Sequence, residues 1–341
     1  MRALLLSSIL FVACAAPDAA TPALSDAPPA RPSTAASLPG ASPPEAQTVR
    51  PESPPQDPVK PGAEPVVVVV DAAAEPVSPE LADSAANVRA GKLREAERQL
   101  DKVLASSTLR PDDRIVAEAL FARCAGGLKR AKDADQRYRG VLSSWPKVMP
   151  ALVAEGLETP DKRQRMARAL AAVGEATLHF GDRARSEADK IAFPTYRGLG
   201  DQASVRKHAE TKIAEWIKKK GAAIDSAEKA YQQIVAIEPL APPAQTVAAA
   251  LRIAEMRAAF VADVHKAPMP RTWIGPEPVV GEVTGDEMRG LYEKALIDAL
   301  EPHRAAIRVA YQGCARTAER YALKTKEAEL CRKWVEENDA K

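Results

Sequence analysis

The sequence predicts an all-α protein from residue 81 to residue 341. Three observations carry this prediction: Ala, Leu, Arg, Lys and Glu dominate this part of the chain, apolar residues recur at helical spacing, and alternating strand-like runs are few. With about 260 residues, it is long enough for one elongated or two compact domains.

The chain opens with a segment typical of a secretory signal. Arg2 precedes the apolar run Ala3–Val12, and small residues follow it. A run of about ten apolar residues is too short to span a bilayer, which takes roughly 20. We therefore expect a signal peptide over residues 1–13 rather than a membrane anchor.

The end of this segment, Phe11-Val12-Ala13-Cys14, resembles the lipobox of bacterial lipoproteins, although Phe11 replaces the usual aliphatic residue. In that family the cysteine is acylated and becomes the first residue of the mature chain. The resemblance thus implies lipidation of Cys14. Because Ala15 rather than Asp follows, it also implies an anchor at the periplasmic face of the outer membrane. The alternative is an ordinary signal peptide cleaved after Ala15-Ala16.

Residues 14–80 differ in composition from the rest of the chain. Residues 15–80 hold 16 of the 29 prolines, with nine acidic and three basic side chains. Such a composition buries too little apolar surface to offset the entropy of ordering, so we expect a disordered tether. The run Val66–Val70 is an exception, because β-branched residues favour extended structure. It is either an accident of the linker or a short strand that docks on the folded domain or on a partner.

From residue 81 the charge is mildly basic, with 44 basic and 37 acidic side chains of mixed order. Nucleic-acid binding would require a concentrated basic face, so we expect none. The one basic cluster, Lys218-Lys219-Lys220, is interpreted as a solvated helix end near Gly221.

A five-residue pattern occurs twice, with a small residue followed at offsets of four, seven, eight and twelve by an aromatic, two aliphatic residues and proline. The two sets are Ala134, Tyr138, Val141, Leu142 and Pro146, and Ala227, Tyr231, Ile234, Val235 and Pro239. A third set lacks the proline: Ala96, Leu100, Val103 and Leu104, with Gly91 five residues before it.

This pattern resembles the second helix of a tetratricopeptide repeat, in which a small residue admits a neighbouring helix and proline ends the helix. The resemblance implies a solenoid of degenerate helical hairpins, with repeats over residues 79–110, 111–148 and 206–239. Between the second and third repeats we expect helices near Asp161–Val173 and Arg183–Ala192, the latter ending by Phe193-Pro194.

The C-terminal third adds a helix closed by Ala267-Pro268-Met269-Pro270, a Gly/Pro-rich loop, and the runs Tyr292–Leu296 and Ala310–Cys314. This succession resembles periplasmic tetratricopeptide-repeat proteins and lipoproteins of myxobacteria, some of which belong to gliding-motility machinery. The resemblance covers about residues 80–341, and its motifs are structural.

Cysteine positions predict one disulfide in the C-terminal helical hairpin, residues 286–338. Cys314 and Cys331 lie on either side of Tyr321–Lys324, where the helical periodicity breaks, and would face each other across the hairpin. The alternative is a pair of buried thiols. Cys124 lies on an apolar helix face and is expected to be a small, inert core residue.

Residues that could support catalysis, a metal or a cofactor do not form a recognisable group. His179, His208, His265 and His303 are far apart in sequence, and there is no phosphate-binding glycine loop or nucleophile elbow. Asp112-Asp113 after Pro111 is typical of a helix N-terminus. We therefore predict a protein that is not an enzyme and has no cofactor, metal or small-molecule substrate.

The leading hypothesis is a lipid-anchored scaffold that binds another envelope protein through a helical surface. The alternative is a ligand-binding or sensory module for peptides or cell-wall fragments, lined by Trp216, Tyr231 or Trp273. Of these, Trp273 in its Pro/Gly-rich loop is the best candidate for an exposed contact residue, and packing is expected for the other two. A cell-wall hydrolase is a third hypothesis, for which no residue stands out.

Overall fold

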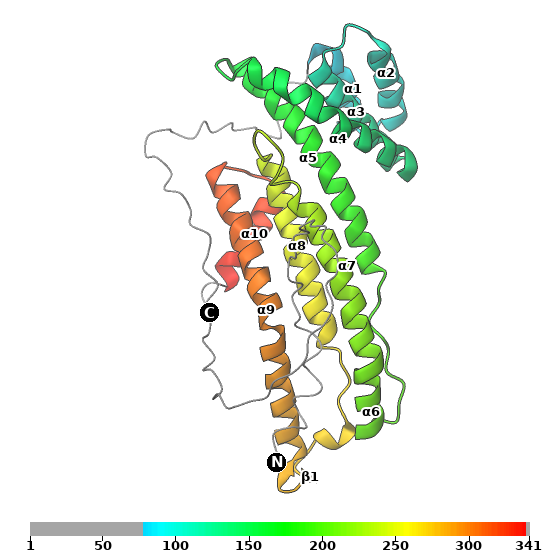
Figure 1. Ribbon diagram of the computed structural model, residues 1–341, viewed down its shortest axis with the longest axis vertical. Coiled ribbons are helices and arrows are strands. Elements are labelled where there is room, and N and C mark those ends of the chain that lie inside the picture. The colour runs from blue at the N-terminus through cyan, green and yellow to red at the C-terminus, as the bar shows by residue number, and fades with distance from the viewer. Residues whose placement is uncertain (1–77, 339–341) are drawn as a thin grey trace, which may run out of the picture. The chain divides into compact units, whose positions relative to one another are not determined.

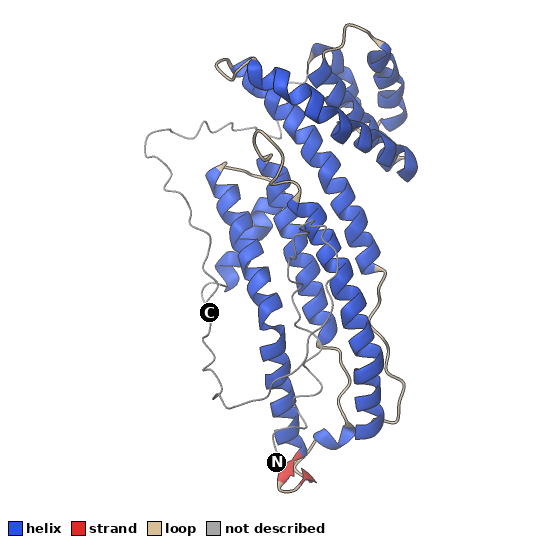
Figure 2. Cartoon of the chain, viewed as in Figure 1, coloured by secondary structure: helices blue, strands red, loops and turns tan. Residues whose placement is uncertain are grey.

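The computed structural model describes residues 78–338, which are almost entirely helical (Figures 1 and 2). The prediction of an all-α fold is confirmed for these residues. The helices are α1 (Pro79–Arg89), α2 (Leu93–Ala105), α3 (Pro111–Gly127), α4 (Ala131–Ala154), α5 (Pro160–Asp189), α6 (Gln202–His208), α7 (Ala214–Gln232), α8 (Pro243–Val264), α9 (Gly285–Arg320) and α10 (Lys326–Asn338). A π-helical turn (Ala209–Ile213), a 3₁₀ turn (Arg271–Trp273) and the strands β1 (Pro278–Val280) and β2 (Val283–Thr284) complete the described structure.

Local sequence determines where many of these helices begin. Helices α1, α3, α5 and α8 start at proline, whose missing N–H and fixed φ suit the first helical position. Helix α9 starts with a reciprocal capping box, in which Thr284 accepts from the Glu287 N–H and Glu287 accepts from the Thr284 N–H. The short antiparallel hairpin β1–β2 leads directly into this cap.

The first four helices form two consecutive helix pairs, α1–α2 and α3–α4. Helix α1 packs on α2, and α3 packs on both α2 and α4. Gly91 turns the chain between α1 and α2 at a φ of 72°, a conformation that favours glycine. Ala96 and Leu100 of α2 are fully buried in a core that also contains Phe121 and Cys124 of α3. Cys124 is thus a buried free thiol, as expected.

Helix α4 continues past the proline that was expected to end it. Pro146 lies inside the helix, which extends to Ala154. Proline removes one helical hydrogen bond, yet residues on both sides of it are held by tertiary contacts. Trp145 and Leu152 are buried in the core between α3, α4 and α5, and Trp145 Nε1 donates to the Glu238 carbonyl at 3.0 Å. Packing therefore outweighs the local stop signal.

Helix α5 is one helix where the sequence suggested two. Residues 160–189 form a continuous helix that packs on α3 and α4 and also on α7 and α8. Ala169, Val173 and Ala176 are buried in the core shared with α4. Further along, Gly181 lies against the ring of Tyr231 in α7. This helix therefore joins the core of the first helices to that of the later ones.

The third predicted repeat, residues 206–239, is not a helical hairpin. Helix α6, the π-helical turn and α7 follow one another without a break, and α7 ends at Gln232, before Pro239. Lys220 is not at a solvated helix end, because it lies inside α7 with its side chain buried and its Nζ donating to the Ala188 carbonyl at 2.7 Å. The partner of α7 is α5, which lies much earlier in the chain.

The C-terminal helices confirm the expected hairpin. Helices α9 and α10 are separated by residues 321–325, and both pack on α8. The rings of Tyr311 and Trp334 stack across the hairpin with centroids 4.3 Å apart. Pro302 lies inside α9, so His303 is a mid-helix residue rather than a first-turn residue.

Candidate functional site

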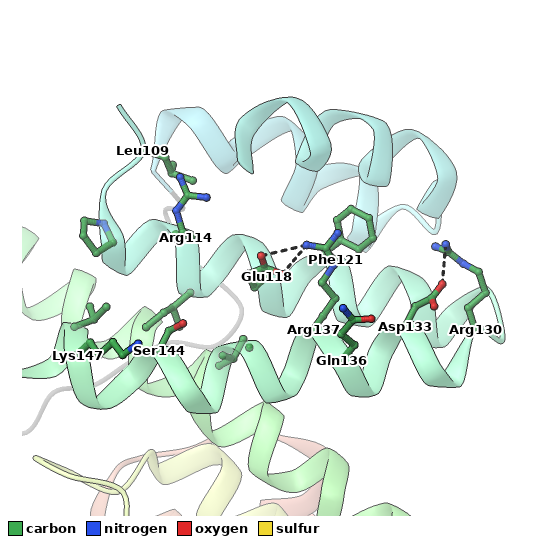
Figure 3. Close-up of a pocket in the computed structure, with 15 residues that line it drawn as sticks. Leu109, Arg114, Glu118, Phe121, Arg130, Asp133, Gln136, Arg137, Ser144 and Lys147 are labelled. Atoms are coloured by element: carbon green, nitrogen blue, oxygen red, sulfur yellow. Dashed lines mark hydrogen bonds and ion pairs between the residues drawn. The ribbon is translucent and has the colours of Figure 1, made fainter. Parts of the chain in front are cut away.

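A groove of about 780 Å³ runs along the antiparallel helices α3 and α4, and one end of it is closed by the α2–α3 loop (Figure 3). Its side chains recur at helical spacing on both helices, so a single face of each helix forms a wall. The lining residues are Leu109, Pro111, Arg114, Ile115, Glu118, Phe121, Arg130, Asp133, Gln136, Arg137, Gly140, Val141, Ser144, Lys147 and Val148.

The centre of the groove is apolar and open. Ile115 and Val141 are buried beneath it. Apart from the backbone of α4 itself, no heavy atom of the described residues lies within 4 Å of the position that a Cβ of Gly140 would occupy. Glycine at this point therefore leaves space that a larger side chain would fill.

Most charged groups along the groove are already paired. Arg137 makes a bidentate interaction with Glu118 at 2.9 and 3.1 Å, and its guanidinium lies 4.0 Å from the centroid of the Phe121 ring. At the far end, Arg130 pairs with Glu97 of α2 and with Asp133. These pairs fix the groove wall and leave little net charge there.

The end of the groove near Leu109 is different, because two cations lie there without a carboxylate partner among the described residues. Arg114 donates to the backbone carbonyls of Leu104 at 2.8 Å and Ser106 at 3.0 Å, which neutralise no charge. Lys147 is exposed, and within residues 78–338 no carboxylate oxygen lies within 4.0 Å of its ammonium. Figure 3 shows both side chains at the same end of the groove. The arrangement suits an anionic group on a bound chain.

A second hollow, of about 400 Å³, adjoins the groove, and Leu109 lines both. It lies where the described chain begins: Ser78 lines it and is buried, and its Oγ has no hydrogen-bond partner among residues 78–338. Arg110 and Asp113 on its wall form an ion pair at 2.8 Å.

A polar cluster between α4 and α5 lies outside the groove lining. Asp135 accepts from His179 Nε2 at 2.7 Å and pairs with Arg183, while Tyr138 donates to Glu175 at 2.7 Å. Burial lowers the pKa of His179, which favours the neutral ring, and burial together with Glu175 raises the pKa of Tyr138. Each group has a structural partner across the helix interface, so the cluster joins α4 to α5.

The sequence-predicted contact residue Trp273 is not exposed. Its side chain is only 8% accessible, and its ring lies 5.7 Å from that of Tyr292 in α9. Gly285 approaches the backbone of Thr272 so closely that a Cβ there would lie 2.5 Å from its carbonyl oxygen. The Pro/Gly-rich loop is therefore packed down on the start of α9, and the expectation of an exposed aromatic is wrong. Trp216 and Tyr231 are also buried, as expected.

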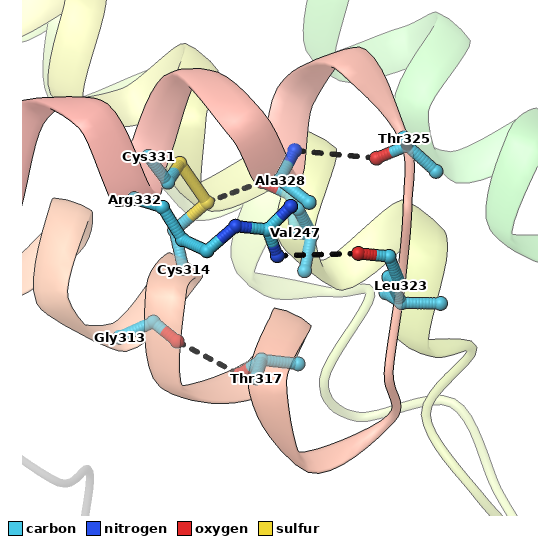
Figure 4. The surroundings of a disulfide bond; sticks show 9 residues. All are labelled: Val247, Gly313, Cys314, Thr317, Leu323, Thr325, Ala328, Cys331 and Arg332. Carbon is cyan, nitrogen blue, oxygen red and sulfur yellow. Dashed lines mark hydrogen bonds between the residues drawn. A yellow bond between two sulfur atoms is a disulfide. The ribbon is translucent and has the colours of Figure 1, made fainter.

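The predicted pair Cys314 and Cys331 forms a disulfide in the structure (Figure 4). Its Cα atoms are 6.0 Å apart, and both side chains are fully buried between α8, α9 and α10. Cys14 and Val66–Val70 lie outside the described residues.

The groove itself was not found by sequence reasoning. Arg114 and Lys147 are separated by 33 positions, and each resembles an ordinary surface cation. The one available signal was Gly140, a glycine in the interior of the helix that carries the repeat pattern.

Among residues 78–338 there is no group of His, Cys, Asp and Glu side chains able to hold a metal ion. No helix in the same range is both long and apolar enough to cross a bilayer. Comparisons of the chain with protein-family models, with curated proteins and with solved structures found no significant match.

Proposed function

We propose that the protein is a non-enzymatic, lipid-anchored scaffold of the bacterial envelope that binds a segment of another envelope protein in the α3–α4 groove. The groove carries the proposal: it is apolar at its centre, open at Gly140, and has two cations without a carboxylate partner within residues 78–338 at one end. An extended segment with apolar residues followed by a carboxylate fits this arrangement.

We further propose that α1–α4 pack as two tetratricopeptide-like repeats. Supporting this, Ala96 and Leu100 in α2 and Ala134, Tyr138 and Val141 in α4 occupy the repeat positions and are all buried. The repeat-like packing is limited to these helices, because the third copy of the pattern lies on α7, which pairs with α5.

The anchor is proposed to be an acylated Cys14 at the outer membrane, with residues 15–77 as the connection to the helices. A triacylated terminus binds a membrane more firmly than a single chain does. Mass spectrometry of the mature N-terminus should find a lipid-modified cysteine, and C14A should move the protein from the membrane to the soluble fraction. An unmodified N-terminus at residue 15, 16 or 17 would contradict the anchor.

Partner binding is tested by filling the groove. In G140L, the new side chain should occupy open space without disturbing the core, because no atom of another described element lies within 4 Å of its Cβ. G221L is the matched control, since Gly221 also lies inside a helix with open space around it.

We expect wild type and G221L to recover the same stoichiometric partner from cross-linked envelopes, and G140L to lose it. Recovery of that partner by G140L at the wild-type level would contradict the proposal. So would cell-wall hydrolysis in a zymogram that G140L abolishes.

A further inference from the structure

The described chain begins beside the groove. Ser78 lines the smaller hollow, and Leu109 joins that hollow to the Arg114–Lys147 end of the groove. Whatever precedes Ser78 must therefore leave the helices close to this end, because it is covalently attached there. The residues in question include the most apolar run before residue 78 outside the signal segment, Val66–Val70, followed by Asp71.

We propose that residues 67–71 of the same chain occupy the α3–α4 groove. A binding partner must then displace a segment of the scaffold itself. This goes beyond the proposed function, which requires only that the groove accepts a segment of another protein.

The connection is long enough. Seven residues, 71–77, separate Val70 from Ser78, and an extended chain of seven residues spans about 23 Å. The groove wall on α4 runs from Asp133 to Val148, about 22 Å at 1.5 Å per residue. Residues 67–71 can therefore reach the Leu109 end and lie along the apolar centre without pulling on the helices.

Charge complementarity favours one direction for the segment. The Leu109 end holds Arg114 and Lys147, which have no carboxylate partner among residues 78–338, so Asp71 would lie at that end. This direction also needs the shorter connection to Ser78, and the valines would lie over Ile115, Val141 and the open space at Gly140. The charge of Asp71 and the apolar character of the valines thus match the two parts of the groove.

A segment tethered beside the groove competes strongly with any free peptide for binding there. A short connection gives an effective concentration in the millimolar range, so even a weakly binding segment keeps the groove mostly filled. A free peptide of the same sequence should then bind the wild-type chain poorly.

The test uses the full chain and a fluorescent peptide of residues 64–77 as the probe. V68D/V69D places a charge on both faces of the valine run and should empty the groove. We expect this variant to bind the peptide at least tenfold more tightly than wild type in fluorescence anisotropy. The matched control, V235D/V309D, changes two exposed valines away from the groove, one in the turn after α7 and one on α9, and should behave as wild type.

A charge exchange tests the direction of the segment. Adding K147E to V68D/V69D should weaken peptide binding about fivefold to tenfold, and a peptide carrying Asp71→Lys should restore it. Adding K102E, which alters an exposed lysine on α2, should change little. Adding G140L should abolish binding of either peptide.

Several results would overturn the inference. One is equal peptide binding by wild type and V68D/V69D, and another is no binding by either. Binding that K147E leaves unchanged would contradict the proposed direction. A wild-type dimer that V68D/V69D dissociates would show that the occupant is a second copy. The proposed function fails separately, if G140L retains the envelope partner.

Discussion

At the scale of single residues, the clearest feature is the buried acidic start of α3. Asp112 is 3% accessible and receives two hydrogen bonds from Arg165 of α5, at 2.9 and 3.0 Å. The sequence correctly placed Asp112 at a helix N-terminus. It could not show that the partner cation comes from another helix 53 residues later.

Replacing this carboxylate tests its contribution. D112N should lower the free energy of unfolding by about 2 kcal/mol at neutral pH, because it removes the buried carboxylate partner of Arg165 and leaves only Glu155, which is exposed, at 2.6 Å. D161N is the matched control: Asp161 also follows the proline that begins a helix, α5, but it is exposed, so we expect a change below about 0.5 kcal/mol. Urea unfolding measures both, and equal effects would contradict the argument.

The interaction of Asp112 with Arg165 also makes the free energy of unfolding depend on pH. Burial alone would raise the pKa of Asp112, but the hydrogen bond and charge of Arg165 and the charge of Arg110 outweigh burial and lower it below 3.8. A carboxyl whose folded-state pKa is lowered stabilises the fold above its unfolded pKa and loses this contribution as the pH falls through the folded value. The difference in unfolding free energy between wild type and D112N should therefore be constant from about pH 5 to 7 and shrink below about pH 4. If the difference in unfolding free energy between wild type and D112N grew as the pH fell, the pKa of Asp112 in the folded state would not be lowered.

At the scale of the helices, the structure differs from local expectation mainly where tertiary contacts oppose a stop signal. Pro146 was expected to end α4, yet the buried side chains of Trp145 and Leu152 on either side hold the helix together. Helix propensity is a weak constraint compared with burial of a helix face. For this reason the repeat pattern in the sequence placed the end of α4 too early.

Replacing Pro146 by alanine should stabilise the protein. P146A restores the missing helical N–H in an exposed position and should raise the free energy of unfolding by about 1–2 kcal/mol. P160A, at the first position of α5 where proline costs little, should leave it unchanged or slightly lower. Thermal and urea unfolding of both variants provide the comparison, and a destabilised P146A would show that the proline is needed for the path of α4.

The contact between α5 and α7 depends on glycine. A Cβ at Gly181 would lie 2.4 Å from Cδ1 of Tyr231, whose buried ring is also held by a 2.7 Å hydrogen bond from its hydroxyl to Asp182. G181A should therefore destabilise the protein by about 1–3 kcal/mol, because the helices must separate. In contrast, G221A adds a methyl group in open space inside α7 and should stabilise by about 0.5–1 kcal/mol. In denaturant unfolding, we expect G181A to lower the free energy of unfolding and G221A to raise it. Changes of the same sign would contradict a close approach of α5 and α7 at Gly181.

At the scale of the whole molecule, α5 connects two groups of the described helices, and a disulfide links α10 to α9. Helix α5 packs on α3 and α4 and also on α7 and α8. At the C-terminal end, Cys314 and Cys331 lie 17 positions apart in the chain and tie α10 to α9. A loop of this length corresponds to about 3 kcal/mol of stabilisation.

Removing the disulfide should loosen the C-terminal hairpin selectively. In C314S/C331S, hydrogen exchange should accelerate in α10 and the adjoining end of α9, with α1–α4 unchanged. C124S, which alters the buried free thiol, should not produce this pattern. A uniform acceleration along the chain would contradict it. The disulfide itself can be checked in the wild-type protein, denatured without reductant and then treated with iodoacetamide. Labelling of Cys314 and Cys331 would show that the bond is absent.

The helical class, the first two helix pairs and the C-terminal hairpin with its facing cysteines could be predicted from local sequence, because each depends on periodicity, capping or spacing within a short stretch. The continuity of α5, the pairing of α7 with α5, the burial of Trp273 and the meeting of Arg114 and Lys147 at one end of a groove could not. These features depend on contacts between residues far apart in sequence, and burial there outweighs local stop signals and loop composition.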